Sequence, residues 1–117
     1  MAGNRNQVIR HRVEEVYKLL VCGHYEALAS LTRGVRLSAD DVRVAVHNYR
    51  YVLRPWPSDQ PMFIDVVEVT GANPRRWNIR ADAYTEEEGR SDLSMELTLI
   101  ESQPAELDVQ FDDLRVL

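Results

Sequence analysis

The chain has 117 residues, of which 44% are hydrophobic and 28% charged, so it can form one domain with a sizeable core and needs no disulfide framework. Its net charge of −5 and isoelectric point near 5.1 disfavour a nucleic-acid-binding protein, which normally presents a basic patch. No stretch approaches the roughly 18 apolar residues of a membrane helix, no signal peptide is visible, and the single cysteine cannot form an internal disulfide. We therefore expect a single cytoplasmic domain over residues 1–117, with residues 1–7 disordered.

Three helices are predicted in the first half of the chain. Apolar residues recur every three or four positions over residues 8–20 and again, more briefly, over residues 25–31, as on one face of an amphipathic helix. Ser38 begins the third helix, because Ser38 and Asp41 have the spacing of a capping box. This helix is expected to end near Tyr51, since two prolines follow and prevent its continuation.

The second half of the chain changes to a period of two, which is typical of strands with one buried face. Four strands are expected, at residues 62–69, 77–84, 93–100 and 107–111, the last with an extension toward Val116. The predicted fold class is therefore α+β, with three N-terminal helices packed on a four-stranded antiparallel meander. An alternative form of this fold is a sheet curled into a cone around a pocket.

The pairing of the second and third strands follows from their alternation. If Ala83 lies opposite Leu93, then Ile79 faces Leu97 and one face of the pair is wholly apolar, as a sheet buried on one side requires. Those residues, with their neighbours on the last strand, form the predicted inner face: Ile79, Ala81, Met95, Leu97, Val109 and Phe111.

The strand at 62–69 is mostly apolar on both faces, which predicts cover on both sides and a homodimer. Asp65 on this strand points into the core in one register and lies near Arg80 in the other. A buried acid with a raised pKa is a common proton-transfer device, so Asp65 is the candidate catalytic residue. The simpler interpretation, which we favour, is an aspartate paired with an arginine or bonded to the backbone. On the polar face, Arg80 is expected to pair with Glu96.

The segment from Tyr84 to Leu93 carries the densest charge in the chain and is predicted to form a hairpin loop. Gly89 is expected to adopt a positive φ, and Arg90 to pair with an acid at the loop base. The loop is either a solvated turn or a charged platform that meets a basic protein partner. The candidate binding residues are Glu86, Glu87, Glu88, Arg90, Asp92, Tyr84 and Trp56.

No metal, cofactor or nucleophile site is predicted. The histidines at 11, 24 and 47 lack the spacing of a helical ligand pair, and the chain has no Asp-rich calcium loop. Cys22 sits in an apolar helical run, where a small buried hydrophobe is the simpler interpretation. Phosphate-binding glycine loops and the Gly-x-Ser-x-Gly elbow of hydrolases are both missing from the sequence.

Four stretches carry a resemblance to a known family. They are Leu20-Val21-Cys22-Gly23-His24-Tyr25-Glu26-Ala27-Leu28, Trp77, the Glu-Glu-Gly-Arg-Ser-Asp-Leu motif at 87–93, and the ending Asp112-Asp113-Leu114-Arg115-Val116-Leu117. In these stretches the chain resembles a family of small bacterial proteins with no assigned activity, a domain of unknown function. The resemblance therefore implies no catalytic residue for this chain. More loosely, the order of elements resembles the SnoaL-like, nuclear-transport-factor-like cone fold, whose pockets serve enzymes with an internal acid or simply hold ligands and partners.

Two functions from different classes follow. The first is a non-enzymatic cytosolic binding protein, for example a toxin-neutralising immunity protein, that meets a basic partner through its acidic loop. The alternative is a small-molecule pocket, or a SnoaL-like enzyme, with Asp65 as its acid. An open cavity with convergent polar groups on the concave face of the sheet would support the alternative, and a solid apolar core would oppose it. We favour the first function because no catalytic constellation is visible.

Overall fold

The computed structural model describes residues 2–33, 36–103 and 106–116. It contains the helices α1 (Ala2–Val21), α2 (Tyr25–Thr32) and α3 (Ala39–Asn48), followed by the strands β1 (Leu53–Arg54), β2 (Ile64–Glu68), β3 (Arg76–Thr85), β4 (Gly89–Gln103) and β5 (Glu106–Val116). All five strands form one antiparallel sheet, in which β3 pairs with β1, β2 and β4, and β4 pairs with β5. The predicted α+β class is confirmed, with five strands in place of the expected four.

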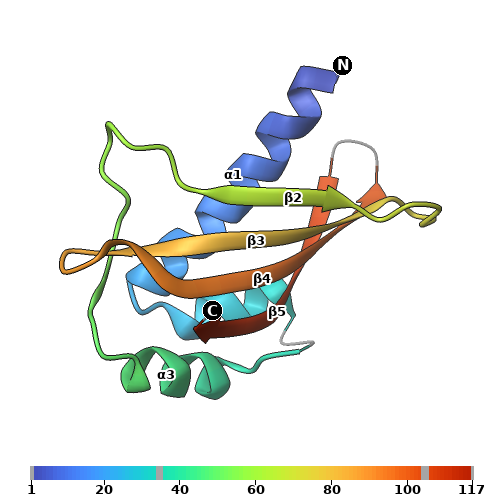
Figure 1. Cartoon of the computed structure of the whole chain (residues 1–117). Helices are drawn as coiled ribbons and strands as arrows, with labels where there is room; N and C mark the ends of the chain where they lie inside the picture. The colour runs from blue at the N-terminus through green and yellow to red at the C-terminus, as the bar shows by residue number, and fades with distance from the viewer. Residues whose placement is uncertain (1, 34–35, 104–105, 117) are drawn as a thin grey trace.

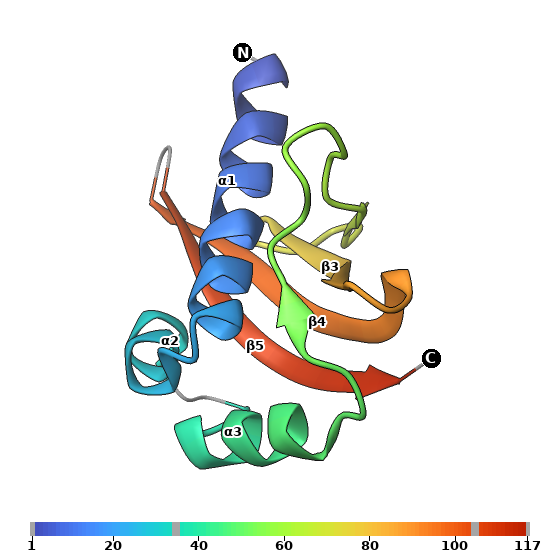
Figure 2. The ribbon, with the colours of Figure 1, turned by 90° about the vertical axis from the view of Figure 1, so that its left-hand side faces the viewer.

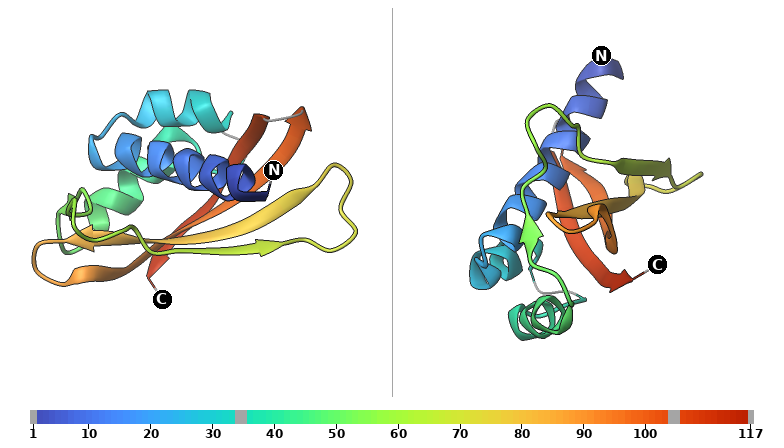
Figure 3. Two further views of the ribbon diagram at one scale, coloured as in Figure 1. Left: turned by 90° about the horizontal axis from the view of Figure 1, so that it is seen from above. Right: turned by 60° about the vertical axis from the view of Figure 1, so that its left-hand side comes forward.

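The helices lie on one face of the sheet (Figures 1 and 2). Seen from above, α1 and α2 form a layer on one side of the sheet, and the opposite face carries no helix of the described chain (Figure 3). The architecture is thus a two-layer one, with an inner sheet face under the helices and an outer face open to solvent.

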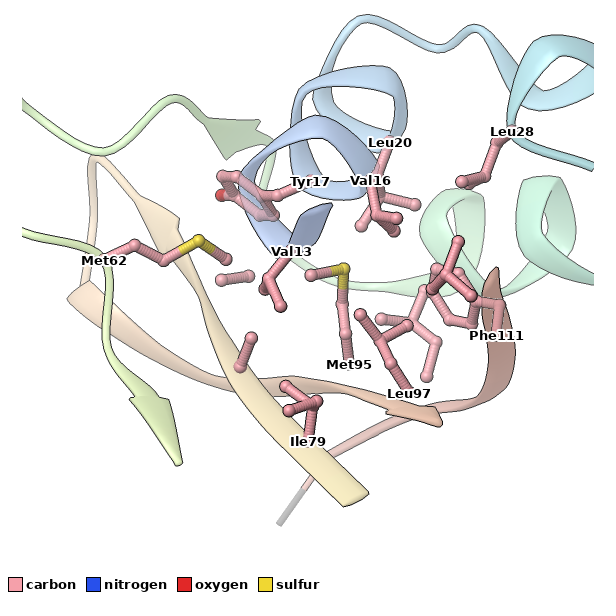
Figure 4. Packing of buried hydrophobic residues seen from close by; sticks show 14 of the residues in the cluster. Val13, Val16, Tyr17, Leu20, Leu28, Met62, Ile79, Met95, Leu97 and Phe111 are labelled. Atoms are coloured by element: carbon pink, nitrogen blue, oxygen red, sulfur yellow. The ribbon is translucent and has the colours of Figure 1, made fainter. Parts of the chain in front are cut away.

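The inner face is a solid apolar core. The side chains of α1 at Val13, Val16 and Leu20 are at most 1% exposed and meet Met95 and Leu97 of β4, as Figure 4 shows. The six residues predicted for the inner face are all buried. This filled face opposes the alternative in which the sheet curls around an open pocket.

The first helix is longer than predicted. Residues 1–7 are expected to be disordered, yet α1 begins at Ala2, whereas Met1 lies outside the described residues. Arg5 accounts for part of the difference, because its guanidinium pairs with Glu101 at 2.6 Å and lies over the ring of Trp77. These contacts fix the early turns of α1 against β3 and β4.

The third helix begins as predicted. Ser38 Oγ accepts a hydrogen bond from the Asp41 amide at 3.1 Å, and the Asp41 carboxylate accepts one from the Ser38 amide at 3.0 Å, which completes the capping box. The hydrogen bond from the Ser38 amide, and next the interaction with the Ser38 side chain, lower the pKa of Asp41. The helix ends at Asn48, and Tyr49 continues in extended backbone. That extended residue is where the candidate site starts.

Candidate functional site

The hairpin between β3 and β4 is tighter than the sequence indicates. Because β3 runs to Thr85 and β4 starts at Gly89, only residues 86–88 connect them. Gly89 has φ = +72°, which confirms the predicted positive φ. The Glu88 amide donates a hydrogen bond to Thr85 Oγ1 at 3.0 Å and closes the turn.

A β-bulge next to this turn breaks the predicted register. Ile79 pairs with Leu97 as expected, but Asp82 pairs with Ser94 and the next pair is Tyr84 with Arg90. Three residues of β4, 91–93, therefore lie opposite the single residue Ala83, and the predicted pairing of Ala83 with Leu93 is wrong. A bulge re-aims side chains, and this one brings Ser91 and Asp92 to the C-terminal end of α3.

Both side chains contact the hydroxyl of Tyr49. Its hydroxyl lies 2.6 Å from Ser91 Oγ and donates toward carboxylate oxygens of Asp92 at 2.5 Å and Glu88 at 2.8 Å. The neighbouring Arg50 approaches Glu88 at 3.3 Å and Asp92 at 4.0 Å. We refer to these five residues as the Tyr49 latch. It joins α3 to the hairpin across about 40 residues of sequence, since Tyr49 and Glu88 are separated by 39 positions.

Burial and the hydrogen bond to Asp92 raise the pKa of Tyr49. The hydroxyl therefore stays protonated and can keep donating its single hydrogen to one of the two carboxylates. The sequence does not indicate the latch, because Tyr49 continues the helical spacing of Val42, Ala45 and Val46 and is expected on the apolar face of the third helix. The bulge brings Asp92 to Tyr49 and Glu88 reaches it from the turn, and strict alternation of residues gives no signal of a bulge.

A second polar cluster lies at the base of the hairpin, around Asp82. The Asp82 side chain is 4% exposed, and Arg90 Nε lies 2.6 Å from its Oδ2 while Ser94 donates to its Oδ1 at 3.1 Å. The Arg90 guanidinium also lies over the ring of Phe63, 3.6 Å from its centroid. The predicted pairing of Arg90 with an acid at the loop base is confirmed, so Arg90 holds the hairpin through Nε while half of its side chain stays exposed.

Trp56 and Tyr84, the two aromatic candidates, lie together beside this cluster. Their ring centroids are 5.2 Å apart, and Trp56 Nε1 donates to the backbone carbonyl of Asp82 at 3.0 Å. Both side chains are half-buried. They brace the base of the hairpin and leave only part of their surface for contact with another molecule.

Glu86 and Glu87 are the tip acids that face solvent. Both are exposed, and neither takes part in an ion pair within the described part of the chain. Glu88 and Asp92, by contrast, belong to the Tyr49 latch. The predicted platform of four acids thus divides into two outward acids and two structural ones.

Asp65 is not the internal acid that the enzyme alternative requires. It lies opposite Arg80 in the backbone register of β2 and β3, without an ion pair between these two described side chains, and it is exposed on the outer face. The expected ion pair of Arg80 with Glu96 is also wrong, although the two residues are cross-strand neighbours. Arg115 of β5 forms an ion pair with Glu96 instead, with its Nε 2.7 Å from Glu96 Oε2, and Arg80 Nε lies 3.8 Å from Asp82 Oδ1.

A groove of about 480 Å³ lies elsewhere, between the C-terminal half of α1 and the proline-rich segment 55–61. Its walls include Tyr17, Trp56 and Met62, and its charged lining residues are Glu14 and Lys18. Asp65 does not contribute to it. Within the described ranges, no group of three or more His, Cys, Asp or Glu side chains could hold a metal ion.

With this geometry in view, comparison with known proteins identifies a family. A family described as Domain of unknown function (DUF7668) matches residues 17–117. The chain belongs to this family. Neither the curated proteins nor the solved structures gave a match. The prediction of a family with no assigned function is confirmed, and the looser resemblance to the cone fold stays a prediction.

The matched region includes every residue of the Tyr49 latch and of the Asp82 cluster, whereas the first turns of α1 precede it. None of the helices in the described ranges combines the length and the hydropathy that crossing a membrane would need.

Proposed function

We propose that the protein is a non-enzymatic binding protein whose hairpin tip meets a basic protein partner. The observation that carries the proposal is the contrast within the tip. Glu86 and Glu87 point to solvent, while the residues around them are fixed by the Tyr49 latch and by the Arg90–Asp82 pair. A tip held in this way presents its two carboxylates at a low entropic cost of binding.

The charge of the whole chain supports the same proposal. A net charge of −5 and two unpaired acids at an exposed turn attract a basic surface and speed the encounter with it. An immunity-like protein that neutralises a basic toxin is the form of this function that we propose, in the cytoplasm. The filled inner face and the exposed Asp65 give no comparable support to a catalytic pocket.

The test begins with capture of partners from the native host on the wild-type protein, followed by association kinetics with the purified partner. In the variant Glu86→Gln with Glu87→Gln, the melting temperature should stay nearly unchanged, because neither side chain forms a hydrogen bond or ion pair with the described residues. Association should be several-fold slower at low salt. The difference should shrink at high salt, as the Debye length falls from about 30 Å at 0.01 M to about 3 Å at 1 M.

The matched control is Glu14→Gln with Glu106→Gln, which removes the same charge from two exposed acids on α1 and β5. It should affect the rate much less than the tip variant does. Glu88 is left intact because it holds Tyr49. Equal association rates for the tip variant and the control at low ionic strength would leave the tip as a solvated turn.

A further inference from the structure

The strand β2 forms an open edge of the sheet. Among the described residues it pairs only with β3, and Figure 1 shows it at the margin of the sheet. Two adjacent valines on it are exposed, Val66 by 41% and Val67 by 57%. The strand has no proline, lysine or bulge, three of the devices that prevent an edge from pairing with another chain, although it is short and carries Asp65 and Glu68.

The backbone groups on this edge can be assigned from two hydrogen bonds. The Val69 amide donates to the Arg76 carbonyl at 2.9 Å, and the Asp82 amide donates to the Phe63 carbonyl at 3.2 Å. Odd-numbered residues of this strand therefore bond inward to β3. Because the groups of an antiparallel strand alternate between its two sides, the even-numbered residues, Ile64, Val66 and Glu68, direct their N–H and C=O groups to the free edge.

We propose that this edge pairs with the same edge of a second copy, antiparallel and centred on Val66, to form a homodimer with one continuous sheet. In this register Val66 lies opposite the partner's Val66, and Ile64 lies opposite the partner's Glu68. Each of these pairs joins residues whose backbone groups face the edge, so each can exchange two hydrogen bonds.

Charge disfavours two alternative registers and leaves a third, centred on Val67, which the lysine variants distinguish. In the register centred on Val66, Asp65 lies on the other face of the added strand, opposite the partner's Val67, so no two acids oppose each other. A register centred on Asp65 would place Asp65 opposite the partner's Asp65, and a register centred on Glu68 would place two glutamates opposite each other. Both are disfavoured because like charges directly opposite each other are destabilising. The strand is only five residues long, so we expect a weak dimer that forms at micromolar or higher concentration.

The experiment compares two neighbouring lysine variants by sedimentation velocity up to high micromolar concentration. Val66→Lys places two like charges across the two-fold axis and should raise the dissociation constant about tenfold. Val67→Lys is the matched control, because it meets the partner's Asp65 and should leave dimerisation intact or strengthen it. Circular dichroism and thermal melting show whether both variants remain folded.

A charge exchange completes the design. Mixing Val66→Lys with Val66→Asp should restore a dimer, now a heterodimer, which a loss of folding could not produce. A wild-type protein that stays monomeric at high micromolar concentration overturns the proposal and leaves the edge to a different partner. A Val67→Lys variant that dissociates as much as Val66→Lys overturns the register centred on Val66.

Discussion

At the scale of single residues, Gly89 shows how the tip depends on backbone conformation. Its φ of +72° is poorly accessible to other residues, and the nearest heavy atom to an added Cβ is Tyr84 Cε2, at 4.0 Å. Gly89→Ala should therefore cost about 1 kcal/mol in the free energy of unfolding through the backbone alone. Denaturant titration measures it.

Gly71→Ala provides the comparison for Gly89→Ala. Gly71 has a φ of +76° with open space around it, but lies in the turn between β2 and β3, away from the latch. It should cost a similar amount without affecting binding at the tip. A Gly89→Ala protein as stable as the wild type would contradict the strain at this position.

Residue types in the loop predicted part of the site. A glycine after three glutamates implies a turn with positive φ, and a lone arginine among acids implies an ion pair, and both are found. Tyr49 could not be predicted as the centre of the latch, since its partners reach it only through the bulge at residues 91–93. The role of Asp65 depended on a register that the alternation of β2 left open, because both faces of that strand are apolar.

At the scale of elements, β4 is an interior strand of the sheet, between β3 and β5. Leu97 is 1% exposed and lies among the core side chains beneath α1 (Figure 4). Leu97→Ala should lower the free energy of unfolding by about 2–5 kcal/mol, because it removes buried methyl groups and leaves a cavity. Val67→Ala on the exposed part of β2 should cost less than about 0.5 kcal/mol. Similar losses for both variants would contradict the assigned core.

The elements that the sequence predicted well have strong periodic signals. The capping box located the start of α3, and alternation located β3 and β4. The strand β1 was missed because two residues carry no period, and it exists only through its pairing with the end of β3. In β5, a register shift between the pairs Glu96–Asp113 and Leu97–Phe111 changes the spacing of buried residues from two to three. That shift explains why strict alternation stops at Phe111, while the predicted extension toward Val116 is present.

At the scale of the whole molecule, Tyr17 joins the helical layer to two strands. Its side chain is 4% exposed, and its hydroxyl donates to the Arg54 carbonyl of β1 at 2.6 Å and accepts from the Tyr84 amide of β3 at 2.9 Å. Burial raises the pKa of Tyr17 to about 12, even though the bond from the Tyr84 amide acts to lower it. The folded state therefore favours the neutral hydroxyl.

This shift predicts how the stability of the molecule depends on alkaline pH. The folded pKa lies above the unfolded value of 10.0, so the contribution of Tyr17 is fully present below pH 10 and is lost as the pH rises toward about 12. The loss should be on the order of 2–3 kcal/mol. Chemical denaturation of the wild type should show the free energy of unfolding falling across this pH range. In Tyr17→Phe it should fall more gradually, because only the pH dependence that comes from the raised pKa of Tyr49 is kept. Tyr17→Phe combined with Tyr49→Phe should be flatter still. If the wild type and Tyr17→Phe lose stability in parallel over this range, the hydroxyl of Tyr17 does not link the two layers in the way that its hydrogen bonds indicate.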